Sequence, residues 1–307
     1  MRTLRIGTRG SALARWQAEH VRDLLEAHHC RSEIEIITTS GDRGQRTRTA
    51  EMTGKALFTK EIEDALLAGD IDLAVHSLKD MSIVMPEGLV LAAVPAREDP
   101  RDAVVTRDGS DFDALGAGAR IGTASVRRAS AVKSLRPDLE VIPIRGNVPT
   151  RLQRVTDGDV DAVILAMAGL RRLGLDSGAR PIDATRFVPA PGQGALGIQT
   201  RGDDAGVLGA VRNIDDVDTH TAVRAERAAL QGLESGCAVP IGAHCRRGEL
   251  TVAVYAVDGS RTLRATVPVD AVAPERGGHA AATDLEQQGA GELIQAALDA
   301  AVSRGLG

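Results

Sequence analysis

A single cysteine, Cys237, stands in a glycine-bordered stretch where a thiol could do chemistry. Gly236 allows a tight turn with no side chain next to the sulfur, and Pro240 with Gly242 keeps the following residues out of a helix. The pattern favours a thiol that is presented to its surroundings. The alternative is an inert, small hydrophobic residue, which is the more frequent role of a lone cysteine.

Polar residues follow a predicted buried strand, residues 71–75, at its carboxyl end. They are His76, Ser77, Lys79 and Asp80. Open α/β sheets bind their ligands at this end of the strands, so these side chains are candidates for a site. For His76 a hydrogen-bonded position in the core is favoured, and Asp80 could instead cap a helix.

Three predicted strand-to-helix junctions combine arginines with hydroxyl groups and glycines. In residues 8–11, Ser11 caps the following helix and Arg9 lies beside its unpaired backbone N–H groups. Residues 121–128 and 144–151 repeat the arrangement with two arginines each. A helix N-terminus with guanidinium groups nearby binds anions, so the last two junctions predict two anion sites facing one crevice.

The stretch 120–154 has eight basic and two acidic residues, although the whole chain has a formal net charge of −5. A solvated charged face is the simpler explanation, but it does not account for the glycines and threonines beside the arginines. The chain has only four lysines among its 37 basic residues. Codon bias would produce this, and the planar fork of arginine also suits carboxylates. A carboxylate-rich ligand fits this composition.

The composition excludes several classes of protein. With 2% aromatic residues and a net charge of −5, the chain does not resemble a nucleic-acid binder. No apolar run approaches the roughly 18 residues of a membrane span, and arginines interrupt the first 17 residues where a signal peptide would be apolar. The three cysteines lack metal-ligand spacing, so we expect no metal. We expect a cytoplasmic protein with no membrane or nucleic-acid partner.

Strands and helices alternate in the first two thirds of the chain, which predicts α/β domains. The proline-broken segments 97–102 and 189–194 look like crossings between domains, after which residues 195–200 rejoin the first sheet as a strand. From residue 217 the pattern changes to a helix, an antiparallel hairpin and a helix near 286–303. The predicted domains are residues 1–96 with 194–216, residues 97–193, and a smaller α+β domain of residues 217–307.

Residues 192–197 match the three-glycine pattern of dinucleotide-binding folds. The prolines at positions 189 and 191 interrupt any strand before it, and Gly202 follows where a helix is required. We therefore interpret this match as accidental.

Taken in order, these segments resemble the hydroxymethylbilane synthase family, also called porphobilinogen deaminases, over nearly the full length. The resemblance implies two domains built like periplasmic binding proteins around a hinge, plus a smaller C-terminal α+β domain. The matching segments are 8–11, 54–58, 75–80, 97–103, 122–128, 145–148 with 150–151, 189–197, and the stretch around Cys237.

The resemblance further implies an enzyme of tetrapyrrole synthesis that joins four porphobilinogen molecules and releases one ammonia per unit. It implies a dipyrromethane cofactor bound to Cys237 through a thioether, and Asp80 as the catalytic carboxylate that stabilises the cationic azafulvene left by ammonia. The implied cofactor-binding residues are Lys79, Thr123, Ser125, Arg127, Arg128, Arg145 and Gly146. The implied substrate-binding residues are Arg9, Ser11, Lys55, Ser77, Arg151 and Arg172.

Four residues depart from the family pattern: Glu51, Ser82, Ala124 and Pro149. None of them removes a catalytic group, and we expect a monomer. A non-catalytic binding protein for an anionic small molecule is the rival hypothesis, since two hinged lobes would serve it. Hydrolysis by a cysteine nucleophile is a weaker alternative, because no histidine is placed by the sequence as a partner for Cys237.

Overall fold

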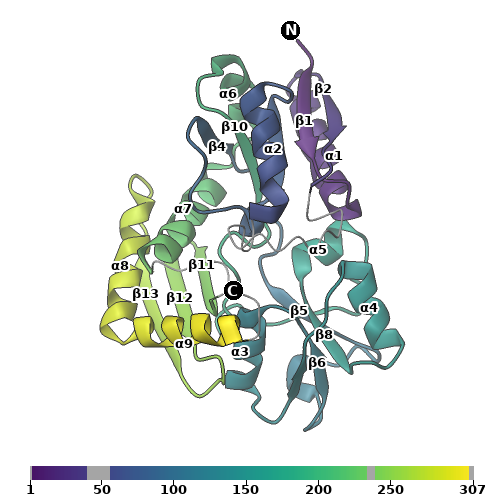
Figure 1. The fold of residues 1–307 in the computed structure, drawn as a ribbon, viewed down its shortest axis with the longest axis vertical. Helices are drawn as coiled ribbons and strands as arrows, with labels where there is room; N and C mark the ends of the chain where they lie inside the picture. The colour runs from purple at the N-terminus through teal and green to yellow at the C-terminus, as the bar shows by residue number, and fades with distance from the viewer. Residues whose placement is uncertain (1, 40–55, 234–238, 304–307) are drawn as a thin grey trace. The chain divides into compact units, whose positions relative to one another are not determined.

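The computed structural model describes residues 2–39, 56–233 and 239–303 of the 307-residue chain (Figure 1). The chain divides into two compact units. Unit 1 is Met1–Glu98 with Ala195–His220, and unit 2 is Asp99–Gly194 with Thr221–Gly307. The chain therefore passes from one unit to the other three times. The first passage, after Glu98, lies within the predicted crossing segment 97–102, and the second, after Gly194, lies at the end of the segment 189–194. The third, after His220, lies inside helix α7 (Val217–Gly232). Lys55 and Cys237 lie outside the described residues.

Unit 1 is built on a five-stranded sheet with strand order β2-β1-β3-β10-β4. The first three of these strands are parallel, and β10 runs antiparallel to both of its neighbours, β3 and β4. The predicted return of residues 195–200 to the first sheet is thereby confirmed. The strands are β1 (Leu4–Thr8), β2 (Ser32–Ile36), β3 (Leu73–Ser77), β4 (Leu89–Ala93) and β10 (Leu196–Arg201).

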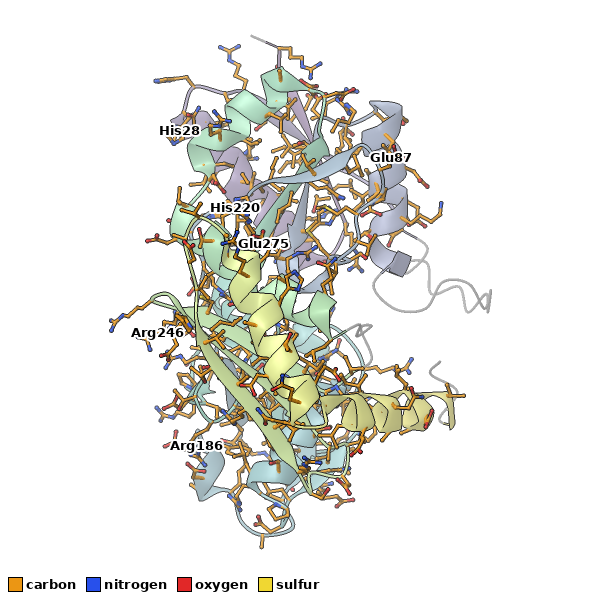
Figure 2. All side chains as sticks on the ribbon, turned by 90° about the vertical axis from the view of Figure 1, so that its left-hand side faces the viewer. His28, Glu87, Arg186, His220, Arg246 and Glu275 are labelled. Atoms are coloured by element: carbon orange, nitrogen blue, oxygen red, sulfur yellow. The ribbon has the colours of Figure 1, made fainter. Side chains whose placement is uncertain are left out.

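Helices cover both faces of this sheet because its central strands are apolar on both sides. On β3, Leu73 and Val75 pack in one buried cluster with α1, whereas Ala74 between them packs in another cluster with α2. The helices are α1 (Ala12–Ala27), α2 (Ala56–Ala68), α6 (Ala205–Val211), and the short 3₁₀ helices η1 (Leu78–Asp80) and η3 (Arg212–Ile214). Helix α1 ends with His28 exposed at its C-cap (Figure 2).

Unit 2 contains a second five-stranded sheet of the same plan, with strand order β7-β6-β8-β5-β9. Three parallel strands, β7, β6 and β8, are again followed by an antiparallel one, β5. The strands are β5 (Asp102–Thr106), β6 (Arg120–Gly122), β7 (Glu140–Ile142), β8 (Ala162–Ala166) and β9 (Arg180–Pro181). The helices are η2 (Phe112–Ala114), α3 (Val126–Leu135), α4 (Val148–Thr156) and α5 (Met167–Arg172).

Unit 2 also contains a three-stranded antiparallel sheet with strand order β11-β12-β13. The predicted hairpin is confirmed as β12 paired with β13, and the predicted C-terminal helix as α9. Strand β11 and helix α8 were not predicted. The elements are α7, β11 (Ile241–Arg246), β12 (Glu249–Tyr255), β13 (Thr262–Pro268), α8 (Pro274–Gln287) and α9 (Ala290–Ser303).

The fold class is thus the predicted one: two α/β sheets and a smaller α+β part. The two sheets of unit 2 share one hydrophobic cluster, in which Tyr255 of β12 packs with Phe187 and Ile121. The Tyr255 hydroxyl also accepts a hydrogen bond from the backbone N–H of Val188 at 3.3 Å. In the parts of the chain that the structure describes, no helix is long and apolar enough to cross a membrane.

Candidate active site

A pocket of about 100 Å³ opens in unit 1 where β1 and β3 end. Strand β1 leads directly into α1, so the β1–α1 junction forms one wall, and the end of β3 with η1 forms another. The structure therefore brings together four of the predicted site residues, Arg9, Ser11, Ser77 and Asp80. The full lining is Arg9, Ser11, Leu13, Ala14, Gln17, Thr59, Ile62, Val75, His76, Ser77 and Asp80.

Ser11 and Ser77 are each held by a hydrogen bond at the pocket. Ser11 is the N-cap of α1, as predicted, and its hydroxyl accepts from the backbone N–H of Ala14 at 3.3 Å. The Ser77 hydroxyl accepts from Nε2 of Gln17 at 2.7 Å. Gln17 is 2% exposed, so a buried amide fixes the orientation of Ser77.

Asp80 is exposed and is the last residue of η1. The alternative that Asp80 caps a helix finds no support, because the N-cap of η1 is Ser77 and no capping side-chain bond is made there. Lys79 precedes Asp80 in the same helix and is half-buried. The Asp80 carboxylate is therefore a negative charge presented at the pocket.

His76 is a buried residue of the pocket wall, with an exposed fraction of 7%. Its Nε2 lies 3.0 Å from Oε1 of Gln199, and Nε2 of Gln199 donates to Oε1 of Glu63 at 3.2 Å. Burial lowers the pKa of His76 to about 4, against the weaker opposing effects of Gln199 and the Asp80 charge. The prediction of a hydrogen-bonded core histidine is confirmed, and the ring is uncharged at neutral pH.

In unit 2, Thr123 and Ser125 organise the junction between β6 and α3. Ser125 is the N-cap of α3, and its hydroxyl accepts from the backbone N–H of Arg128 at 3.4 Å. The Thr123 hydroxyl in turn accepts from the backbone N–H of Ser125 at 3.2 Å. The junction predicted from residues 121–128 is therefore a capped helix start.

Arg127 and Arg128 are both buried and share the carboxylate of Asp102. Nη2 of Arg127 lies 2.8 Å from Oδ2 of Asp102, and Nη2 of Arg128 lies 2.8 Å from Oδ1. Arg127 also donates to the carbonyl of Val188 at 2.8 Å, and Arg128 donates to that of Ile164 at 3.0 Å. Burial lowers the pKa of Arg128, with the Asp102 charge opposing that shift.

This pairing was not foreseen from the sequence, which assigned both guanidinium groups to ligand carboxylates alone. Asp102 has an exposed fraction of 0%, so its charge is compensated inside the protein. Two guanidinium groups against one carboxylate leave one net positive charge. Sequence reasoning missed Asp102, although its place at the end of the predicted crossing segment 97–102 was a signal that could have found it.

Arg145, Gly146 and Arg151 surround the junction between β7 and α4. Gly146 has a φ of +118°, which glycine adopts readily, and its carbonyl accepts from Nε of Arg151 at 2.8 Å. Burial lowers the pKa of Arg151. Asn147, which sequence reasoning missed, is the N-cap of α4, and its side chain accepts from the backbone N–H of Thr150 at 3.0 Å. The sequence did contain a signal for this cap: an asparagine directly before a helix start, with a proline in the first turn of the helix.

Arg172 is buried on α5, with an exposed fraction of 8%, and its Nη2 donates to the carbonyl of Gly194 at 2.7 Å. The carbonyl belongs to the last residue of the proline- and glycine-rich segment 189–194. No helix follows that segment, because β10 begins at Leu196. The rejection of a dinucleotide site in residues 192–197 is therefore confirmed.

The residues at the two junctions of unit 2 fit a group that carries carboxylates. Arg145 is exposed, and neither Arg145 nor Arg151 has a carboxylate partner among the described residues. Two capped helix N-termini and the net positive charge around Asp102 add further donors. Such an arrangement has donors in excess, and anionic oxygens are the acceptors that would satisfy them.

Two family models match the chain. Residues 4–209 match the model described as porphobilinogen deaminase, dipyromethane cofactor binding domain, and residues 220–287 match the porphobilinogen deaminase C-terminal domain. Curated relatives are named porphobilinogen deaminase. That of Syntrophobacter fumaroxidans is 45% identical, covering 96% of this chain and 97% of its own. That of Geobacter metallireducens is 46% identical, covering 98% of this chain and 96% of its own.

Solved structures of binding proteins also align with the chain. The methionine-binding protein MetQ is 13% identical with a TM-score of 0.45, covering 71% of this chain and 92% of that chain. A periplasmic substrate-binding protein of an ABC transporter from Coxiella burnetii is 13% identical with a TM-score of 0.43, covering 71% of this chain and 94% of that chain.

Proposed function

The chain belongs to the porphobilinogen deaminase family, and from this premise we propose the roles of its residues in that family's reaction. The protein is an enzyme, a transferase of tetrapyrrole biosynthesis with a dipyrromethane cofactor. It polymerises four porphobilinogen molecules into hydroxymethylbilane and releases ammonia. The family match rules out the rival hypotheses of a non-catalytic binding protein and a cysteine hydrolase.

The observation that carries the assignment of roles is the pocket at the end of β3. Asp80 places an exposed carboxylate there, with the buried His76 kept uncharged behind it. Loss of ammonia from a protonated aminomethylpyrrole moves the positive charge from the nitrogen to the methylene carbon and the pyrrole ring. A carboxylate fixed beside the ring stabilises that charge more in the transition state than in the ground state, because the charge reaches the ring only as the C–N bond breaks. Asp80 is therefore the catalytic residue of this proposal.

The cofactor would be held by a thioether to Cys237 and by the cofactor-binding set predicted above. The arrangement of donors at the β6–α3 and β7–α4 junctions supports this part of the proposal. When bound, dipyrromethane supplies the pyrrole to which the first substrate unit is joined. Asp102 fixes the guanidinium groups of Arg127 and Arg128, so these residues present donors whose orientation is set before the ligand arrives.

The proposed substrate-binding residues supply cationic and hydroxyl groups that suit the two carboxylates of porphobilinogen. In unit 1 these are Arg9, Ser11 and Ser77, which line the pocket with Asp80, together with Lys55. In unit 2 they are Arg151, whose Nε is already oriented by the Gly146 carbonyl, and Arg172. Each charge-assisted hydrogen bond is worth on the order of 1.5 to 3 kcal/mol, so several of them orient a small dicarboxylate.

Intact-mass measurement tests the function most directly. The purified protein should be heavier than its sequence by one dipyrromethane, whereas the Cys237→Ser protein should have the mass of the bare chain. Cys30→Ala is the matched control, because Cys30 is a half-buried thiol that should leave the adduct in place. A bare-chain mass for an active wild-type preparation would refute the assignment of Cys237.

We further propose that the enzyme is a cytoplasmic monomer that binds neither nucleic acid nor membranes. The support comes from the sequence, with its net charge of −5 and 2% aromatic residues. Light scattering coupled to size-exclusion chromatography should give the mass of one chain of 32.2 kDa plus its cofactor. A mass of two chains would contradict this proposal.

A further inference from the structure

Three side chains from three elements of unit 1 form a hydrogen-bonded chain behind the Asp80 pocket. Glu63 comes from α2, Gln199 from β10 and His76 from β3. Gln199 donates from Nε2 to Oε1 of Glu63 at 3.2 Å, and Oε1 of Gln199 lies 3.0 Å from Nε2 of His76. Gln199 is 0% exposed and His76 is 7% exposed, so water does not compete for the bond between them.

This chain of bonds determines which nitrogen of His76 carries the proton. A carboxylate only accepts hydrogen bonds, so the amide of Gln199 has to turn its NH₂ group toward Glu63. Its oxygen then faces His76, and an amide oxygen also only accepts. Nε2 of His76 is therefore the protonated nitrogen. The contact with Glu63 decides which end of the Gln199 amide is the oxygen and which is the NH₂ group.

The other ring nitrogen, Nδ1, is then an acceptor with a free lone pair. It makes no hydrogen bond within the residues that the structure describes, and His76 is part of the pocket wall together with Asp80. Of the charged groups nearby, Asp80 from η1 and Arg9 from the β1–α1 junction line the same pocket, and Glu63 from α2 is linked to the ring through Gln199. Burial keeps the ring neutral by lowering the pKa of His76 to about 4.

We propose that His76 is a substrate-binding residue whose Nδ1 accepts a hydrogen bond from an N–H group of porphobilinogen. Gln199 and Glu63 are the positioning residues that fix the required tautomer. The proposal rests on the function proposed above for the Asp80 pocket. Porphobilinogen offers two kinds of N–H donor, the pyrrole and the aminomethyl ammonium group, and Asp80 with Nδ1 of His76 gives this pocket two acceptors for them.

A neutral, weakly basic imidazole suits this position for two reasons. It accepts a hydrogen bond from an ammonium group, whose pKa is roughly 10, without removing the proton, so the nitrogen stays protonated and can leave as ammonia. It also places no positive charge near Asp80. A protonated imidazole would pair with the carboxylate and compete with the substrate for it.

The first test is the tautomer itself, measured by ¹⁵N NMR of the histidine-labelled holoenzyme at pH 7.5. The His76 resonances, identified by their absence in His76→Phe, should show a protonated Nε2 and an unprotonated Nδ1. In Glu63→Leu the Gln199 amide is free to turn over, so we expect a mixture of tautomers. Asp64→Leu is the matched control, because Asp64 is 59% exposed and, among the residues that the structure describes, pairs with Lys60 one turn earlier in α2.

The second test is steady-state kinetics with porphobilinogen. His76→Phe keeps the ring size and loses both nitrogens, so kcat/KM should fall about ten- to hundredfold, the loss expected for one hydrogen bond to a charged or polar donor. Glu63→Leu should lower kcat/KM in the same direction, and Glu63→Asp should recover part of the loss. Asp64→Leu should stay within about twofold of the wild type.

A third measurement does not depend on the activity of any His76 variant. In the slow Asp80→Asn enzyme, saturating porphobilinogen should shift the Nδ1 resonance toward that of a hydrogen-bonded nitrogen. A protonated Nδ1 in the wild type, an unshifted Nδ1 resonance with substrate, or an unchanged kcat/KM in folded His76→Phe would each overturn the proposal. Failure of the proposed function looks different, since the wild type would then lack the dipyrromethane mass.

Discussion

Two aspartates of this chain, Asp80 and Asp102, differ in burial and therefore in what their charges can do. Asp80 is exposed at a pocket and has no hydrogen bond among the described residues, so its charge is available to a cationic ligand. Asp102 is fully buried between Arg127 and Arg128, so its charge is used inside the protein. The first is suited to electrostatic catalysis and the second to holding two cations in place.

For Asp80 we predict a loss of catalysis without a loss of fold. Asp80→Asn keeps the size and removes the charge, so single-turnover kinetics should show a decrease of at least about a hundredfold. Asp80→Glu keeps the charge at a displaced position and should retain part of the activity. Circular dichroism and thermal unfolding should match the wild type, because the carboxylate is exposed. Near-normal turnover in Asp80→Asn would remove this residue from the mechanism.

For Asp102 we predict a loss of folding stability. Asp102→Asn leaves two buried guanidinium groups without a counter-charge, and breaking a buried ion pair in this way costs about 3–5 kcal/mol. Denaturant unfolding should show that decrease in the free energy of unfolding. Asp113→Asn is the control, since Asp113 pairs with Arg186 at the surface and should change stability by less than about 1 kcal/mol. Equal decreases in the free energy of unfolding for the two substitutions would show that the buried ion pairs contribute no more to stability than the exposed one.

At the scale of elements, two strand-to-helix junctions of unit 2 present hydrogen-bond donors in the same way. Ser125 caps α3 and Asn147 caps α4, so the N-terminus of each helix is held beside arginines. The β7–α4 junction depends in addition on Gly146, whose positive φ aims its carbonyl at Arg151. The backbone of this junction therefore helps to position the side chain of Arg151, which we propose to bind substrate.

We predict that Gly146→Ala impairs both this junction and substrate binding. A Cβ at position 146 would have a strained φ and would lie 2.8 Å from Cγ2 of Thr150. The expected cost is about 1–2 kcal/mol of stability together with a raised KM for porphobilinogen. Gly116→Ala is the control, because nothing lies within 4 Å of its added Cβ. An unchanged KM in Gly146→Ala would show that substrate binding does not depend on the backbone conformation at Gly146.

At the scale of the whole molecule, the described residues form three sheets, and the chain divides into two compact units. Tyr255 of β12 belongs to the hydrophobic cluster of the second sheet, and Gly242 of β11 approaches the carbonyl of Val188 closely. The predicted division into three domains stays a prediction. We propose that residues 97–193 and the C-terminal sheet, although separate in architecture, unfold together.

Hydrogen exchange of Tyr255→Ala tests this proposal. Removing a buried aromatic ring costs about 3–5 kcal/mol, so slowly exchanging amides of β8 and of β12 should both lose protection by a similar free energy. Amides of β3 in unit 1 should keep theirs. Loss of protection confined to β11–β13 would mean that the C-terminal sheet is an independent domain, as the sequence boundaries at 193 and 217 suggest.

The sequence alone determined the features that depend on neighbouring residues. Ser11 predicted the capped start of α1, and the polar residues after the predicted strand 71–75 predicted the pocket that Asp80 lines. These succeed because helix caps and strand alternation are local, and because the carboxyl ends of parallel strands meet at one edge of a sheet. The similarity of whole segments to a family then identified the reaction.

The tertiary structure alone decided which remote groups meet. His76 and Gln199 are 123 positions apart, and they pair because β10 enters the sheet beside β3 in a register that places Gly197 opposite His76. Arg128 finds Asp102 for a similar reason, since β5 returns antiparallel beside β8. Register between strands distant in sequence is set by the whole core, so no local pattern could have predicted these partners.

Helix α8 was missed for a related reason. Gly277 and Gly278 lie within it, and glycine has low helix propensity, so the local pattern argued against a helix. In the folded protein a Cβ at position 278 would lie 2.5 Å from the carbonyl oxygen of Ala225, so glycine is what allows α8 to pack closely against α7. The local cost of glycine is offset by a close contact that exists only in the tertiary structure.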